Sequence, residues 1–96
     1  MLVLITYDVD TISETGQKRL RKVAKVCQDY GQRVQNSVFE CRLSESQFVI
    51  LKNRLIGIIN PKLDSVRFYF LGNNWNRRIE TIGKISTPNL DDDLII

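Results

Sequence analysis

The stretch Arg-Val-Gln-Asn-Ser-Val-Phe-Glu-Cys-Arg-Leu, residues 33–43, decides the fold. Its composition is typical of a β-strand, but the apolar positions change parity, since Val34 is even-numbered whereas Phe39 and Cys41 are odd-numbered. Side chains alternate between the two faces of a strand, so one unbroken strand cannot place both sets on one face. A break at Asn36 and Ser37 resolves the conflict. The pattern therefore predicts two short strands.

Upstream of this stretch, the sequence predicts a strand followed by a helix. Residues 2–7 form a continuous apolar run, which favours a central strand covered on both faces. Thr11 and Glu14 have the spacing of a capping box, so we expect a helix to begin within residues 13–16. Apolar residues then recur at helical spacing, and Gly31 is placed to cap the end of the helix.

Downstream, the order of elements continues with a helix and two strands. Ser44 and Gln47 form a second capping-box pair, and Pro61 ends the helix that they begin. We expect the remaining strands at residues 64–71 and 78–85.

The first six elements have the order β-α-β-β-α-β, to which residues 78–85 add a short last strand. This order is the ferredoxin-like α+β arrangement, in which two helices cover one face of an antiparallel sheet. The other face is then open. A second copy of the sheet is its simplest cover, so the fold itself predicts a two-fold homodimer. We expect residues 1–88 to form a single domain and residues 89–96 to form an acidic mobile tail.

The residue inventory excludes several kinds of chemistry. The 96 residues contain no histidine, so zinc sites of the Cys/His kind and Ser-His or Cys-His nucleophiles are excluded. Cys27 and Cys41 fall at apolar-periodic positions and are interpreted as small core residues. No apolar run is long enough to cross a membrane, and no secretory signal is present. We therefore expect a cytoplasmic protein without a membrane partner, in which hydrolysis would require carboxylates and a metal-bound water.

Charge is distributed unevenly. Residues 1–88 hold all 14 Lys and Arg but only 8 of the 11 Asp and Glu, and the other three acids are Asp91, Asp92 and Asp93. A basic body suggests a polyanionic partner, although a solvated basic face is an alternative of equal weight. We expect phosphate contacts from arginines and base stacking from an aromatic residue, at Arg19, Arg21, Arg33, Arg77, Arg78 and Phe39. Core packing is the stronger alternative for Phe39, because of its parity in the strand. Trp75 is interpreted as a dimer contact.

Asp8 is the best-placed metal ligand, because it directly follows the first strand. From its spacing alone, a turn-capping role is the stronger alternative. One carboxylate makes a weak Mg²⁺ site, but a dimer in which the two first strands approach the symmetry axis would supply two. The two like charges would repel each other unless a cation lay between them. Asp10 is expected to point to the same side and assist.

Three segments resemble a known family: the strand ending in Tyr7-Asp8-Val9, the helix around residues 18–24, and the run YGQRVQNSVFEC at residues 30–41. Over about residues 2 to 85, the chain is similar to the CRISPR-associated protein two family, the small subunit of the spacer-acquisition machinery. The resemblance implies a ferredoxin-like homodimer, with the last strand able to dock on the partner's sheet. It also implies a metal aspartate at Asp8 with Tyr7 beside it.

The resemblance leaves two functions open. The first is a Mg²⁺-dependent (or Mn²⁺-dependent) endonuclease that acts on single-stranded RNA or double-stranded DNA, with Asp8 and Tyr7 as catalytic residues and Asp8 as metal ligand. The second is a non-catalytic scaffold that binds DNA within the complex of the CRISPR-associated integrase. By resemblance, the functional arginines are Arg19 and Arg33, and the strand aromatic is Phe39. A ligand-sensing domain is a third alternative, since this fold hosts many functions.

Overall fold

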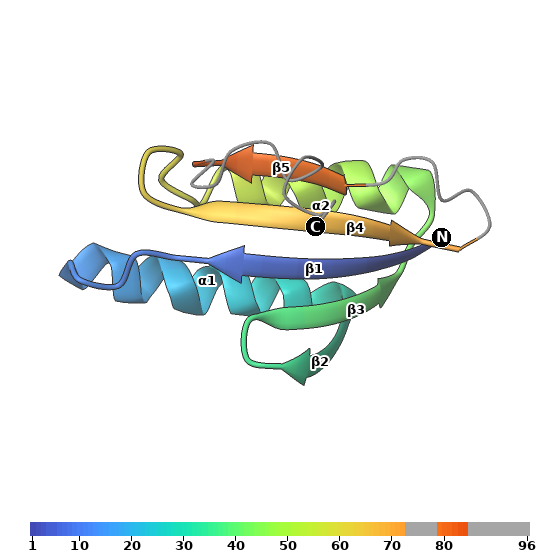
Figure 1. Ribbon diagram of the computed structural model, residues 1–96, viewed down its shortest axis with the longest axis horizontal. Coiled ribbons are helices and arrows are strands. Elements are labelled where there is room, and N and C mark those ends of the chain that lie inside the picture. Colours follow the sequence, from blue (N-terminus) through green and yellow to red (C-terminus); the bar gives the residue numbers. More distant parts are fainter. Residues whose placement is uncertain (73–78, 85–96) are drawn as a thin grey trace, which may run out of the picture.

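The computed structural model describes residues 1–72 and 79–84. Five antiparallel strands form one layer, in the order β2-β3-β1-β4-β5, and both helices lie on one face of this sheet (Figure 1). This is the ferredoxin-like α+β arrangement that the sequence predicts. The elements are β1 (Leu2–Asp8), α1 (Glu14–Tyr30), β2 (Gly31–Gln35), β3 (Val38–Arg42), α2 (Glu45–Ile56), β4 (Ser65–Leu71) and β5 (Ile79–Gly83).

The predicted break in residues 33–43 is confirmed. β2 ends at Gln35 and β3 begins at Val38, and Ser37 in the turn has a positive φ of 62°. The register between the two strands shifts between Arg33 and Gln35, which is an irregularity of the β-bulge kind. The shift allows Phe39 to face the helices although Val34 stays exposed.

β1 is the central strand of the sheet, as predicted, but the described part of its own chain covers only one of its two faces, and cover of the other face by a second copy stays a prediction. Its odd-numbered residues, such as Val3 and Ile5, are buried, whereas its even-numbered residues Leu2, Leu4 and Thr6 are only partly buried. The reason is that both helices pack on the same face of the sheet. The second face, which we call the open face, has no cover in the described part of the chain.

The ends of the helices differ in detail from the prediction. The N-cap of α1 is Ser13, whose hydroxyl accepts a hydrogen bond from the Gly16 N–H at 3.1 Å, and Thr11 is not the capping residue. The capping box of Ser44 and Gln47 at the start of α2 is confirmed. However, α2 ends at Ile56, before Pro61, because the chain leaves the helix at the Gly57 C-cap.

The two cysteines belong to the core, as predicted. Cys27 and Cys41 are free and buried, and burial raises the pKa of Cys27 to about 12 and that of Cys41 to about 11. Both thiols are therefore protonated and unreactive at neutral pH.

The last strand, β5, pairs with β4 of the same chain, and Glu80 on it forms an ion pair with Lys52 of α2. Docking of this strand on a partner stays a prediction of the family resemblance. Trp75, Arg77, Arg78 and residues 89–96 lie outside the described residues. Neither helix in the described part is long and apolar enough to cross a membrane.

Candidate metal and nucleic-acid site

Asp8 is the last residue of β1 and is exposed. It has the same parity as Leu2, Leu4 and Thr6, so its side chain belongs to the open face. In the sheet it lies opposite Ser65 of β4. Together they border a hollow of about 190 Å³ whose lining is Thr6, Tyr7, Asp8, Ser65, Arg67 and Tyr69. The hollow thus combines an acid with a cation and hydroxyl groups.

Tyr7 does not share this face with Asp8. Its side chain is buried on the helix side, with its ring 6.2 Å from that of Phe39. Burial, more than any other influence, raises the pKa of the Tyr7 hydroxyl. The expectation that Tyr7 acts beside Asp8 as a catalytic residue is therefore corrected, because neighbouring residues of a strand point to opposite faces.

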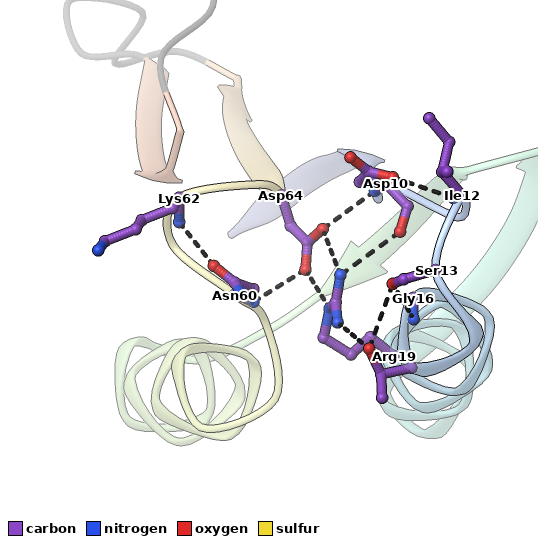
Figure 2. Close-up of polar contacts among 9 residues, drawn as sticks. Asp10, Ile12, Ser13, Gly16, Arg19, Asn60, Lys62 and Asp64 are labelled. Atoms are coloured by element: carbon purple, nitrogen blue, oxygen red, sulfur yellow. Dashed lines mark hydrogen bonds and ion pairs between the residues drawn. The ribbon is translucent and has the colours of Figure 1, made fainter.

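A polar cluster follows directly after Asp8 (Figure 2). At its centre, the carboxylate of Asp64 accepts hydrogen bonds from Arg19 Nε at 2.7 Å and Nη2 at 3.3 Å. It also accepts the backbone N–H groups of Asp10 at 3.0 Å and Asn60 at 2.8 Å. We call these four residues the Asp64 cluster. It joins the exit of β1, the first turns of α1 and the loop before β4.

Arg19 is occupied by this cluster. Besides its two bonds to Asp64, it donates Nη1 to Thr15 Oγ1 at 3.2 Å and Nη2 to the Asp10 carbonyl at 3.4 Å. Four of the five guanidinium donors are thereby used. The expectation that Arg19 holds a phosphate is corrected accordingly, since the guanidinium is already paired with an acid inside the molecule.

Nothing in the sequence indicates a role for the Asp64 carboxyl. It is fully buried. Burial raises its pKa, but the hydrogen bonds from Arg19, Asn60 and Asp10 and the charge of Arg19 outweigh burial, and the pKa lies below its usual value. No local sequence signal points to this pair, because its partners are separated by 45 residues.

Asp10 is part of the cluster and not of the hollow at Asp8. Its Oδ1 accepts the Ile12 N–H at 3.0 Å, which leaves it in a turn-capping role. The expectation that it assists Asp8 is therefore corrected. In residues 1–72 and 79–84, no three Cys, Asp or Glu side chains gather as a possible metal site.

The expected aromatic base platform is also corrected. Phe39 is fully buried in the core, and the guanidinium carbon of Arg33 lies 5.0 Å from the centre of its ring. A base therefore has no access to Phe39. Arg33 is exposed, so its phosphate contact stays a prediction.

A second feature, which we call the helix groove, lies between α1 and α2. It has a volume of about 500 Å³ and is lined by Lys18, Arg21, Lys22, Lys25, Val26, Arg54 and Ile58. Lys25 and Arg54 both pair with Asp29, at 2.6 and 3.4 Å. The helices cover one face of the sheet and Asp8 belongs to the other, so groove and carboxylate lie on opposite sides of the molecule.

The molecule is a small ferredoxin-like domain with an acidic strand end and a basic helix layer. This class is defined by the order of the strands, the placement of the helices and the exposed aspartate that ends the first strand. The family model described as CRISPR associated protein Cas2 matches residues 1–79. The chain belongs to this family.

Several relatives support this assignment. The chain is 53% identical over 96 residues, all of both chains, to a CRISPR-associated endoribonuclease Cas2 of Chlorobaculum tepidum. It is 57% identical over 95 residues, 99% of both chains, to a CRISPR-associated endonuclease Cas2 of Halalkalibacterium halodurans. The crystal structure of Streptococcus pyogenes Cas2 at pH 6.5 is 63% identical and superimposes with a TM-score of 0.71 over 86% of this chain and 100% of that one.

Proposed function

We propose that this protein is a homodimeric, Mg²⁺-dependent endonuclease of single-stranded RNA or double-stranded DNA that serves in CRISPR spacer acquisition. The observation that carries the proposal is the exposed Asp8 carboxylate at the end of β1, on the open face. The printed names of the relatives, endoribonuclease and endonuclease, support the reaction class.

The open face supports the homodimer. Large apolar side chains remain exposed on or near it, among them Leu71 at 45% and Ile79 at 40%. Leu71 lies opposite Leu2 in the sheet, and Ile79 lies opposite Tyr69. Burial of such a patch against a second copy would remove apolar surface from water. The same contact would bring the β1 strands, and with them the two Asp8 carboxylates, toward each other.

The donor set fits Mg²⁺ (or Mn²⁺) as a shared site. Mg²⁺ is commonly held by one or two carboxylates, keeps several waters and completes its shell with substrate phosphates. One exposed carboxylate for each chain meets this requirement in a dimer. When bound, the metal would polarise the phosphodiester and activate water. The chain's own contributions are Asp8, which would hold the ion, and Arg67, which lines the same hollow and would contact a phosphate.

We expect the substitution Asp8→Asn to reduce Mg²⁺-dependent cleavage. The amide keeps one oxygen ligand but loses the charge. Loss of a residue that merely supports a metal ligand typically costs roughly 10- to 100-fold, so the expected reduction is at least about tenfold. Cleavage of single-stranded RNA and of duplex DNA is measured separately, each with Mg²⁺ and with a chelator.

Glu40→Gln is the matched control for this experiment. Glu40 is also exposed, lies on the open face opposite Leu4, and undergoes the same change of charge. We expect cleavage by this variant to equal that of the wild type. Equal cleavage by the wild type and Asp8→Asn would remove the nuclease assignment to Asp8.

A non-catalytic DNA-binding scaffold for the associated integrase is the second candidate function, and the helix groove favours it. Its cations lie on the side of the molecule opposite Asp8, where they can hold a phosphate backbone without bringing it to the carboxylate of the same chain. Such contacts fix position but do not read sequence.

We expect the triple variant Lys18→Gln/Arg21→Gln/Lys22→Gln to bind duplex DNA more weakly and with less salt dependence. Each lost phosphate contact lowers the slope of log K against log salt concentration by about 0.9, so that three contacts lower it by roughly 2.7. Affinity is measured by fluorescence anisotropy over a salt series. Arg42→Gln/Lys62→Gln/Lys84→Gln has the same net charge and is the control; an equal change in both variants would contradict a role for the groove.

A further inference from the structure

The lining of the helix groove is both apolar and cationic, and a bare phosphate chain complements only its cationic part. Val26 and Ile58 contribute apolar surface to its lining, and the surrounding side chains are cationic. Within residues 1–72 and 79–84, the side chains of Lys18, Arg21 and Lys22 have no hydrogen-bond or ion-pair partner. A ligand that is both acidic and apolar would complement this surface better than a purely anionic one.

The described part of the chain ends beside Asp64, the centre of the Asp64 cluster. The Lys84 N–H donates to the carbonyl oxygen of Asp64 at 2.6 Å, directly after β5. The side chain of Asp64 contacts Arg19, the neighbour of Lys18, and the N–H of Asn60, which lies two residues beyond Ile58. Two successive contacts through Asp64 thus link Lys84 to Arg19 and Asn60, which are near neighbours in sequence of the groove residues Lys18 and Ile58.

The remaining sequence has the complementary composition. Residues 85–96 follow Lys84, and a chain of this length spans up to roughly 40 Å when extended. Its last part contains three successive carboxylates, Asp91, Asp92 and Asp93, between the apolar residues Leu90 and Leu94. Ile95 and Ile96 follow Leu94.

We propose that segment 89–96 docks in the helix groove of its own chain, with its carboxylates against Lys18, Arg21 and Lys22 and its apolar residues against Val26 and Ile58. Because the segment is attached, it competes at a high effective concentration. Its effect on nucleic-acid binding rests on the proposed function. The docked segment pairs with the cations that a phosphate backbone would otherwise contact, so it competes with nucleic acid for the groove.

Carbodiimide cross-linking of the full chain tests this directly. The reagent joins a carboxylate and an amine in contact by an amide bond, and mass spectrometry of the peptides locates it. We expect Asp91–Asp93 to be joined to Lys18 and Lys22 severalfold more often than to Lys62. Lys62 is the matched control, since it is also exposed and lies two residues from Asp64, so that proximity alone would favour it.

Protein labelled with ¹⁴N and protein labelled with ¹⁵N are unfolded together and refolded, so that mixed dimers form. Links only within one isotope support docking in the same chain, whereas links between the isotopes at the frequency of mixed dimers would overturn it. A preference for Lys62 would also overturn it. Substitution of Asp91, Asp92 and Asp93 would remove the reacting carboxylates themselves, so it cannot test docking by cross-linking. The apolar variant Leu94→Ser/Ile95→Ser/Ile96→Ser keeps these carboxylates, and we expect it to reduce the links severalfold.

A double-mutant cycle with duplex DNA connects docking to nucleic-acid binding. We expect Asp91→Asn/Asp92→Asn/Asp93→Asn to raise DNA affinity in the wild-type chain, but not in the Lys18→Gln/Arg21→Gln/Lys22→Gln background. An equal rise in both backgrounds would indicate a general effect of net charge and would contradict competition in the groove. Cross-linking needs no nucleic acid, so links without DNA binding would refute the proposed binding of DNA in the groove and leave docking intact.

Discussion

Replacement of Asp64 by alanine is expected to lower the free energy of unfolding by about 3 to 5 kcal/mol, the usual cost of removing one partner of a buried ion pair. Asp64 is fully buried and accepts four hydrogen bonds. Alanine would leave Arg19 without its acid and the N–H groups of Asp10 and Asn60 without an acceptor. Urea denaturation at one fixed protein concentration measures the loss, since a dimer's stability depends on concentration.

Asp29→Ala is the control for this prediction. Asp29 also pairs with two cations, Lys25 and Arg54, but these pairs are on the surface. Exposed pairs contribute little because water and salt screen them. We expect no measurable change in the urea midpoint, and a loss as large as that of Asp64→Ala would contradict the importance of burial.

The same cluster gives stability a pH dependence of known sign. The folded-state pKa of Asp64 is lowered, so its contribution is fully present above the unfolded-state pKa, which is about 3.9 for an aspartate. The contribution is lost as pH falls from there through the folded-state value. From neutral pH down to the unfolded-state pKa, the difference in stability between the wild type and Asp64→Ala should therefore stay constant. Below that pH, the difference should shrink.

Gly16→Ala is expected to destabilise the protein by about 1 to 3 kcal/mol, the usual cost of overpacking a well-packed site. Helix propensity alone predicts the opposite, a gain of roughly 1 kcal/mol for alanine over glycine within a helix. However, a Cβ at Gly16 would lie 1.9 Å from the carbonyl oxygen of Asp10 and 3.0 Å from the Cα of Thr11. Both are backbone atoms, so the loop after β1 would have to move.

Gly57→Ala is the matched control. Gly57 follows α2 with φ of −73°, which any residue adopts, and a Cβ there would meet nothing closer than 3.6 Å. We expect this variant to be as stable as the wild type or slightly more stable. Thermal or urea unfolding of both variants checks the contrast; a gain in stability for Gly16→Ala would show that the close contact with Asp10 is absent.

Both predictions concern the segment that follows Asp8. The Asp64 cluster holds this segment by side-chain hydrogen bonds, and the lack of a side chain at Gly16 leaves room for the backbone of Asp10 beside α1. The position of the proposed metal ligand at the end of β1 therefore depends on residues that would never contact the ion. This dependence also explains why an arginine assigned to phosphate binding by resemblance proves to be structural.

Two features of the candidate site could be predicted from the sequence: the position of Asp8 at a strand end and the basic face of α1. The sequence did not allow the partners of Arg19 to be predicted, whereas the parity of the strand already favoured core packing for Phe39, which the structure confirms. Tyr7 was assigned to the site because it is adjacent in sequence, but the alternation of the strand turns it into the core. Arg77 and Arg78 lie outside the described residues and stay predictions.

The sequence by itself determined the features that arise within a few residues: the break before Val38, the capping box at Ser44, and the amphipathic pattern of α1. These depend on alternation, helical periodicity and local hydrogen bonds, which neighbouring residues settle among themselves. Only the tertiary structure decided which face of β1 is covered and that Arg19 pairs with Asp64 across 45 residues. Such choices depend on how whole elements pack, because a buried charge selects its partner from whatever the packed chain brings within reach.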